Sequence, residues 1–343
     1  MKRAHFTAKL AVAFFALAMG RATNADAAIF CVNSPGAIAS ALSSAASNGA
    51  SDEIRILAGS YVTPGFDYSS SEPFAITISG GWLPGCDHGF AGDTSTLDGD
   101  HQAGALQIHA AAEDAEVQLG RLVFVNGAAG ALGGGLYVSS GGSIRIEDCA
   151  FYLNQAQYAG GVYASATGSI VIRNNVFFGN SALAEGAGVL QYGFEAFVTG
   201  NTVVANSATG PDDDGTGGLH LAGDGALIFA NNLLWNNGLF DVYNDVPNAT
   251  FLHNDFAHLF GDQPGPASEA NYDVEPEFAP GLLNLHLAAG SALVNAGIDD
   301  PDGGIGNLDF DGAARRQGAH VDIGAYETDV LFFGGFQTLP VPG

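Results

Sequence analysis

The stretch FYLNQAQYAGGVYA, from Phe151 to Ala164, contains the spacing that decides the fold of this chain. A phenylalanine is followed three residues later by Asn154, and a glycine pair follows at Gly160 and Gly161. The same skeleton recurs on both sides of this stretch. Self-similarity at a fixed period is typical of repeat architectures, so the repeat has to be interpreted before any single motif.

Three columns of residues define the repeat. Aligned on asparagine, the units are VFVN (123–126), FYLN (151–154), FFGN (177–180), VVAN (203–206) and LLWN (233–236), whose asparagines are Asn126, Asn154, Asn180, Asn206 and Asn236. A second asparagine column contains Asn175, Asn201 and Asn231, and a glycine column contains Gly135, Gly161, Gly188 and Gly218. The columns keep step with one another, which indicates one structural unit per repeat.

Each unit holds three short alternating or β-branched segments separated by glycine and asparagine, which is typical of strands and tight turns. We therefore predict an all-β, right-handed parallel β-helix in which successive turns stack like strands of a parallel sheet. In this alignment Phe151, Phe177, Val203 and Leu233 face inward as one column. The two asparagine columns form ladders of hydrogen-bonded amides at the corners.

The repeat resembles that of the polymorphic outer membrane proteins, which combine a Phe-x-x-Asn motif with a Gly-Gly-aliphatic tripeptide. Phe151–Asn154 and Phe177–Asn180 match the first motif, and the tripeptides at 134–136, 160–162 and 217–219 match the second. The resemblance covers residues 121–240. It implies a β-helix of the pectate-lyase-like kind, a fold that serves adhesins and carbohydrate-active enzymes alike.

The N-terminal region predicts export and a cap. A basic start, an apolar run at 10–19 and an Ala-x-Ala pattern at 25–27 predict a signal peptide over residues 1–27. Ser34, Pro35 and the Asn48-Gly49 pair frame a helix over about 34–48, which we expect to close the front of a coil spanning residues 28–282. Because export permits disulfides, we expect Cys31 to pair with Cys86, and Cys149 to be a buried free thiol.

The C-terminal region has a different character from the repeats. Residues 283–328 resemble the choice-of-anchor Q segment of secreted β-helix proteins, through 291–297 (SALVNAG), 309–312 (DFDG), Arg316 and 322–327 (DIGAYE). The resemblance implies an exported protein, extracellular or at the outer cell surface, and implies no reaction. The apolar tail, residues 329–343, has two possible interpretations: a sorting signal or a final edge strand.

Charge excludes several classes of partner. Without the predicted signal peptide the chain keeps six arginines, no lysine and 35 acidic residues, a formal charge of −29. Nucleic acids and anionic lipid surfaces need clustered cations, so neither is an expected partner. No apolar stretch after the signal peptide is long enough to span a membrane. We expect a monomer whose partners are a polysaccharide or a surface protein.

Calcium is the one cofactor that the carboxylates suggest. Asp212, Asp213 and Asp214 form an acidic turn that interrupts the repeat, and Asp309 and Asp311 resemble the start of a calcium loop. No glutamate stands at the later position that such a loop requires, because residue 320 is His. A solvated acidic surface, or neutralisation by Arg315 or Arg316, is the alternative interpretation.

The sequence lacks the catalytic motifs that the related enzyme classes would require. No Gly-His-Gly, Arg-x-Lys or Gly-x-Ser-x-Gly motif is present. Glu147 and Arg173 fall one turn apart, as expected of a cross-strand ion pair, and His253 and His258 are expected to be structural or exposed. A polysaccharide lyase or glycoside hydrolase therefore remains the alternative to a non-catalytic binding protein.

One column of outward side chains is the candidate ligand surface. The residues that follow the inward aliphatic of each unit are Tyr137, Tyr163, Leu190 and His220, with Tyr192 nearby. Aromatic rings stacked at the turn spacing could receive sugar rings, or could serve only to stabilise the face of the sheet. The sequence leaves both readings open.

Overall fold

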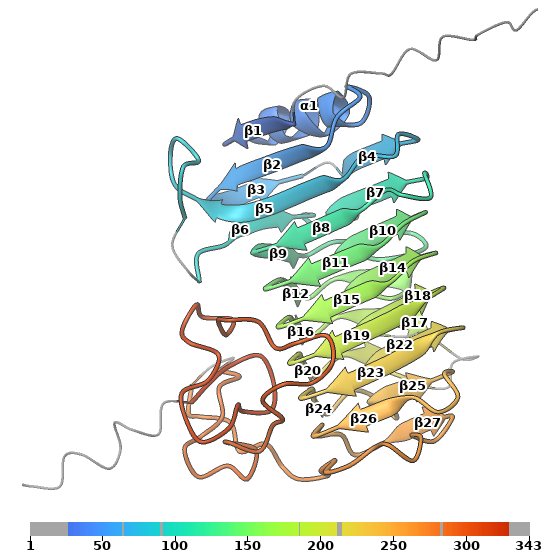
Figure 1. Cartoon of the computed structure of the whole chain (residues 1–343). Helices are drawn as coiled ribbons and strands as arrows, with labels where there is room; N and C mark the ends of the chain where they lie inside the picture. The colour runs from blue at the N-terminus through green and yellow to red at the C-terminus, as the bar shows by residue number, and fades with distance from the viewer. Residues whose placement is uncertain are drawn as a thin grey trace, which may run out of the picture.

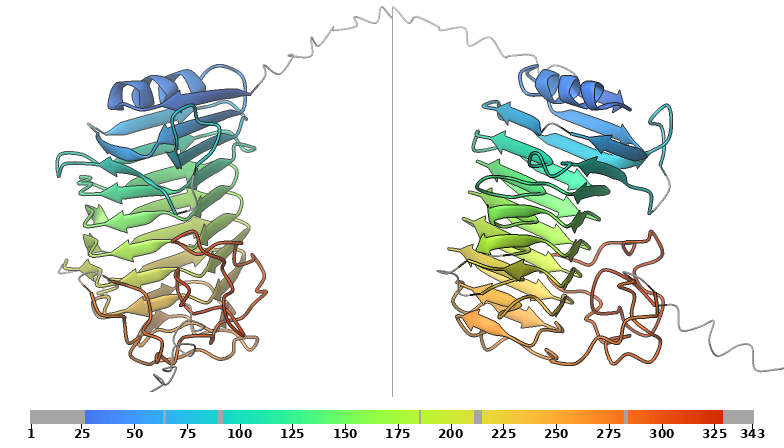
Figure 2. Two further views of the ribbon diagram at one scale, coloured as in Figure 1. Left: turned by 90° about the vertical axis from the view of Figure 1, so that its left-hand side faces the viewer. Right: turned by 180° about the vertical axis from the view of Figure 1, so that it is seen from behind.

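The chain winds as a right-handed parallel β-helix, which confirms the predicted fold class (Figure 1). The computed structural model describes residues 27–63, 65–89, 92–184, 186–210, 215–281 and 284–328. Most turns contribute one short strand to each of three long parallel sheets, and the turns stack along one axis (Figures 1 and 2). The predicted signal peptide and the tail after residue 328 lie outside the described residues, apart from Ala27.

The three long sheets and one short sheet account for all the strands among the described residues. Sheet A has nine strands: β1 (Ala28–Val32), β2 (Asp52–Leu57), β5 (Ile76–Trp82), β8 (Val117–Gly120), β11 (Ile144–Glu147), β15 (Ile170–Arg173), β19 (Glu195–Thr199), β23 (Ala226–Ala230) and β26 (Thr250–Leu252). Sheet B has seven: β3 (Gly59–Val62), β6 (Ser95–Asp98), β9 (Leu122–Val125), β12 (Ala150–Tyr152), β16 (Val176–Phe178), β20 (Thr202–Val204) and β24 (Leu233–Trp235). Sheet C has eight: β4 (Phe66–Ser70), β7 (Leu106–Ala110), β10 (Leu136–Ser140), β14 (Val162–Ala166), β18 (Gly188–Tyr192), β22 (Leu219–Gly223), β25 (Val242–Asn244) and β27 (Leu259–Gly261). Sheet D consists of β13 (Gln155–Tyr158), β17 (Ser181–Ala184) and β21 (Ser207–Ala208).

Inward-facing columns fill the coil because parallel pairing in register places equivalent residues directly above one another. The rings of Phe124, Phe151 and Phe177 stack face to face, with centroids 5.0 and 4.7 Å apart. Val203 continues this column, and Leu234 rather than the expected Leu233 follows it. Each buried phenylalanine contributes about 2 kcal/mol through apolar burial, and stacking adds about 1 kcal/mol.

Two asparagine ladders run along the corners, as predicted, but their membership differs from the expected one. One ladder joins Asn154, Asn180, Asn206 and Asn237, with amide-to-amide distances of 2.9, 2.8 and 2.9 Å, and ends on the carboxylate of Asp241. The other joins Asn175, Asn201, Asn232, Asn254 and Asn271. Asn126, Asn231 and Asn236 were therefore wrongly assigned to the ladders.

The error arises at asparagine doublets, where the first and second residues adopt different conformations. Asn231 and Asn236 have positive φ angles of 56° and 57°, and the residues that follow them enter the ladders. Asn126 also has positive φ, and its amide bonds the carboxylate of Asp98. Asparagine tolerates the left-handed conformation better than most residues, so it suits both positions of such a corner.

A helix closes the first turn of the coil. Helix α1 (Pro35–Ala45) begins after Ser34, whose Oγ accepts a hydrogen bond from the backbone N–H of Ala37, and it ends earlier than the expected residue 48. It buries Ile38 and Leu42 against the end of the coil (Figure 1). A disulfide joins Cys31 and Cys86, the pair expected from the sequence, and Cys149 is a buried free thiol.

The C-terminal segment, which we define as residues 273–328, lies against the outer face of sheet B (Figures 1 and 2). Parallel bridges continue the coil as far as Tyr272, so the coil ends before the expected boundary at residue 282. Leu293, Ile323 and Ala325 pack with Val176 and Leu233 in a second apolar core. Sheet B is consequently buried on both faces there, which explains its run of apolar residues.

Candidate functional site

The candidate ligand surface is the outward column of sheet C. Parallel register aligns, in strand order, Asp67, Gln107, Tyr137, Tyr163, Val189, His220, Tyr243 and Phe260. Alternation along each strand turns these side chains away from the core. The structure thus brings three of the expected ligand residues, Tyr137, Tyr163 and His220, into one column.

Two expected members of this surface are wrong, because strand β18 is shifted by one residue relative to the alignment. Gly188 occupies the inward position that Val162 and Leu219 hold in the neighbouring strands. Leu190 and Tyr192 therefore face inward and are buried. Burial raises the pKa of the Tyr192 hydroxyl, and that hydroxyl has no hydrogen-bond partner among the described residues. Val189, a small aliphatic residue, interrupts the aromatic column instead.

The aromatic rings of the column stack mainly on one another. The rings of Tyr137 and Tyr163 are nearly parallel with centroids 5.7 Å apart, and those of His220 and Tyr243 are 4.2 Å apart. The hydroxyl of Tyr163 donates to Oε1 of Gln191 at 2.7 Å, and Nε2 of His220 lies 3.0 Å from Oδ2 of Asp245. Each of these stacking contacts covers one face of the rings involved.

Tyr137 stands at one end of the tyrosine stack, next to a cavity. One face of its ring covers Tyr163, and the other side borders a cavity of about 320 Å³. Small residues and backbone form most of the cavity wall, including Gly104, Gly130 and Gly133. The sequence did not indicate this cavity, because loop 128–133 forms one wall and its path is not encoded in the repeat.

Two polar side chains also line the cavity. Asp67 and Gln107 are exposed, and neither side chain makes a hydrogen bond or ion pair within the described residues. Both groups are therefore available to a ligand, one as an acceptor and the other as donor and acceptor. The cavity combines an aromatic face with a few polar groups, as sites for small ligands commonly do.

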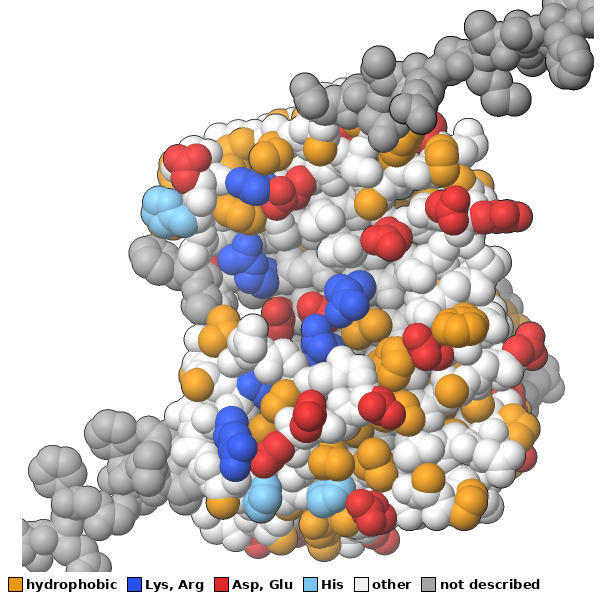
Figure 3. Space-filling model, in the orientation of Figure 1, with side chains coloured by type: hydrophobic (Ala, Val, Ile, Leu, Met, Phe, Trp, Pro, Cys, Tyr) orange, Lys and Arg blue, Asp and Glu red, His pale blue; other side chains and the backbone are white. Residues whose placement is uncertain are grey.

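Cationic side chains lie on other faces of the molecule. Figure 3 shows the face of sheet A, where basic side chains gather beside a hollow between the loop around residue 89 and the C-terminal segment. Arg173 and Arg145 both bind Glu147, which confirms the expected Glu147–Arg173 pair. The guanidinium groups of Arg55 and Arg121 lie 4.3 and 5.1 Å from the ring centroid of Trp82.

The hollow beside these arginines is a second cavity of about 340 Å³. It is lined by Arg121, Asp148, Leu308 and Phe310, among others. Burial raises the pKa of Asp148, whose carboxylate accepts a hydrogen bond from Asn174. Asp93 also lines the cavity and attracts Arg121, and Asp309 adds a third carboxyl group to the lining.

Of the carboxylates expected to bind calcium, Asp309 and Asp311 are described, and they contact different partners. Asp309 accepts hydrogen bonds from the backbone N–H groups of Ala313 and Glu327, whereas Asp311 contacts Nε2 of His286 at 2.6 Å. Asp212, Asp213 and Asp214 lie outside the described residues. In the part of the chain that is described, no three metal-ligating side chains form a group that could hold a metal ion.

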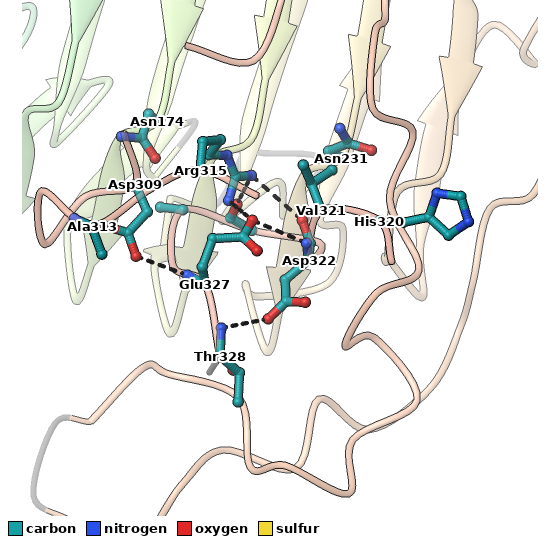
Figure 4. A network of polar contacts seen from close by, with 12 residues as sticks. Asn174, Asn231, Asp309, Ala313, Arg315, His320, Val321, Asp322, Glu327 and Thr328 are labelled. Carbon is teal, nitrogen blue, oxygen red and sulfur yellow. Dashed lines mark hydrogen bonds and ion pairs between the residues drawn. The ribbon is translucent and has the colours of Figure 1, made fainter. Parts of the chain in front are cut away.

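The charged residues of the C-terminal segment form a structural network (Figure 4). The buried guanidinium of Arg315 contacts Glu327 at 2.5 Å and donates to the carbonyl oxygen of Gly324 at 2.7 Å. Burial raises the pKa of Glu327, and Arg315 opposes that shift. Arg316 pairs instead with Asp299 at 3.2 Å. The network fixes the fold of the segment.

The outward asparagines attach this segment to the coil. Asn231 accepts a hydrogen bond from the N–H of Ile298 and donates to its carbonyl oxygen, and Asn174 donates to the carbonyl oxygen of Leu308. Gly324 has a φ of 110°, and a Cβ there would lie 2.8 Å from the Thr202 hydroxyl. His253 contacts the carbonyl oxygen of Ala296 through Nδ1, and His258 is exposed.

Comparison with known proteins supports the fold. Residues 110–256 match the family model described as right handed beta helix region. No curated protein and no solved structure gives a significant match to this chain. Among the described residues, no helix is both long and apolar enough to cross a membrane.

Proposed function

We propose that this protein is an exported, non-catalytic β-helix protein of the outer cell surface or extracellular space, and that it binds glycan in the cavity at Tyr137. The observation that carries the proposal is the Tyr137 ring, one side of which borders a cavity that also holds Asp67 and Gln107, two exposed polar side chains without a partner in the described part of the chain. An aromatic face packs well against the apolar face of a sugar ring, and the carboxylate and amide can bind its hydroxyl groups.

A binding role fits this cavity better than catalysis. Hydrolysis of a glycosidic bond usually requires two carboxyl groups on opposite sides of the bond. The residues that line the cavity provide one, Asp67, and no arginine or lysine that could act as a base in a lyase. The carboxyl groups with raised pKa values, including Asp148, Asp241 and Asp255, lie away from it.

Export is supported by the predicted signal peptide and the disulfide in the first turns of the coil. Attachment at the surface is supported by the resemblance of residues 283–328 to the choice-of-anchor Q segment. N-terminal sequencing of the protein secreted by its natural host should begin at Ala28. Retention of the intact N-terminus inside the cell would contradict export.

The binding proposal is tested with a panel of polysaccharides and oligosaccharides scored for both binding and cleavage. The wild-type protein should bind at least one glycan, Tyr137→Ala should reduce that binding at least ten-fold, and no reducing ends should appear. Phe194→Ala is the matched control, because Phe194 is an aromatic residue that is 67% exposed and lies outside the column. Equal binding by wild type and Tyr137→Ala, or cleavage of the glycan, would refute the proposal.

A further inference from the structure

We propose that the cavity at Tyr137 selects uncharged sugar residues and rejects uronic acids and sulfated sugars. This inference rests on the proposed function and specifies the ligand class of the same site. The reasons are the charge of the cavity itself, the absence of cations on the surrounding sheet, and the chemistry that the two polar side chains offer.

The cavity carries a single charged side chain, Asp67. Its carboxylate is exposed and makes no ion pair within the described part of the chain. A carboxylate or sulfate group entering the cavity would therefore meet a like charge and no cation. Placing an uncompensated charge in a partly dehydrated site is unfavourable.

No cation stands near enough on sheet C to compensate this charge. The eight strands of sheet C contain no arginine or lysine. The six arginines of the described residues lie elsewhere: Arg55, Arg121, Arg145 and Arg173 on sheet A or its corner with sheet B, and Arg315 and Arg316 in the C-terminal segment. Recognition of carboxylate or sulfate groups normally uses paired guanidinium or ammonium donors.

The other ionisable side chains that face outward beside this column provide no guanidinium or ammonium group. They include His109, His220 and Asp245, and His220 contacts Asp245. Repulsion of an anionic glycan extends over about one Debye length, roughly 8 Å at physiological ionic strength.

The same groups suit an uncharged sugar. The Asp67 carboxylate can accept hydrogen bonds from neighbouring hydroxyl groups, and such charge-assisted bonds are stronger than neutral ones. The Gln107 amide can donate to one hydroxyl oxygen and accept from another hydroxyl group. The adjoining Tyr137 ring can contact the apolar face of the pyranose.

The test compares ligands that differ only in charge. Binding is measured at pH 8, at low and high salt, to an oligosaccharide array that includes neutral, uronate and sulfated glycans. Each hit is then compared with a matched pair, such as methyl-esterified and free-acid oligogalacturonate. We expect Tyr137-dependent binding only to uncharged glycans. Tyr137-dependent binding that favours the anionic member of a pair would overturn this inference and leave the proposed function intact, whereas the absence of any Tyr137-dependent binding would overturn both.

The variant Asp67→Asn tests the cause of the selection. Two like charges about 6 Å apart repel by at least about three-fold in an equilibrium constant, even in the dielectric of bulk water. Asp67→Asn should therefore raise the ratio of uronate to neutral binding by at least about three-fold at low salt, and by less at high salt. An unchanged ratio in a variant with wild-type circular dichroism would refute the role of Asp67.

Discussion

The asparagine doublet at Asn236 and Asn237 offers a direct test of the register, because the two neighbours have opposite roles. The Asn237 side chain takes part in four hydrogen bonds: its oxygen accepts from the backbone and side chain of Asn206, and its Nδ2 donates to Val203 and Asp241. Asn236 is exposed and has a positive φ angle. A substitution should therefore be severe at one position and mild at the next.

The magnitude follows from those four bonds. Each buried hydrogen bond contributes about 1 kcal/mol net, and a buried polar group left without a partner adds further cost. Asn237→Ala should therefore lower the free energy of unfolding by about 4 kcal/mol. Asn236→Gly should change it by no more than about 0.5 kcal/mol, because glycine adopts positive φ without strain.

Urea denaturation followed by far-ultraviolet circular dichroism measures both variants without relying on Trp235, which adjoins the doublet. We expect a clear decrease in the midpoint for Asn237→Ala and almost none for Asn236→Gly. A larger loss for Asn236→Gly, or a loss below about 1 kcal/mol for Asn237→Ala, would show that the register of the ladder is wrong.

Three further predictions concern the disulfide, the C-terminal segment and pH. Replacing Cys31 and Cys86 by serine should destabilise the protein by about 4 kcal/mol, since the disulfide closes a loop across a separation of 55 residues. A wild-type thermal midpoint that is the same with and without reductant would contradict this prediction. Arg315→Met should lower the free energy of unfolding by about 3–5 kcal/mol, because Glu327 is then buried without its ion-pair partner. Limited proteolysis of this variant should remove the residues after 272 first, and protease resistance equal to that of the wild type would contradict the prediction. Burial raises the pKa of Asp255 to about 7, above its unfolded value, so the native state binds more protons than the unfolded state between about pH 4 and pH 7. Stability should consequently fall by up to about 1.4 kcal/mol per pH unit as pH rises through that window, and thermal melts of Asp255→Asn should show a flatter profile than wild type.

The repeat was sufficient to predict the coil because its signal is periodic. Phe151, Phe177 and Val203 stand at constant spacing, so their stacking follows from sequence alone. The spacing does not predict which residue occupies a ladder position where a unit contains two adjacent asparagines. Asn236 and Asn237 have the same chemistry, and only the path of the backbone decides which one enters the ladder.

The candidate site was less predictable for a related reason. Tyr137 and Tyr163 follow the repeat and were found, whereas the inward position of Gly188 carries no aliphatic residue to mark the register of Tyr192. The cavity depends on loop 128–133, and the cover of sheet B depends on contacts between residues more than a hundred positions apart, such as Ala325 with Thr202. Neither feature has a local sequence pattern.

The first asparagine ladder has a direction, and Asp241 determines where it stops. Every amide in it donates toward the C-terminal end, from Asn154 through Asn180 and Asn206 to Asn237. Asp241 accepts from Asn237 and from the N–H groups of Ala257 and His258, but an ionised carboxylate has no hydrogen to pass on. An added turn would need a donor where Asp241 stands, so this single acid works as a chain terminator that limits the length of the ladder.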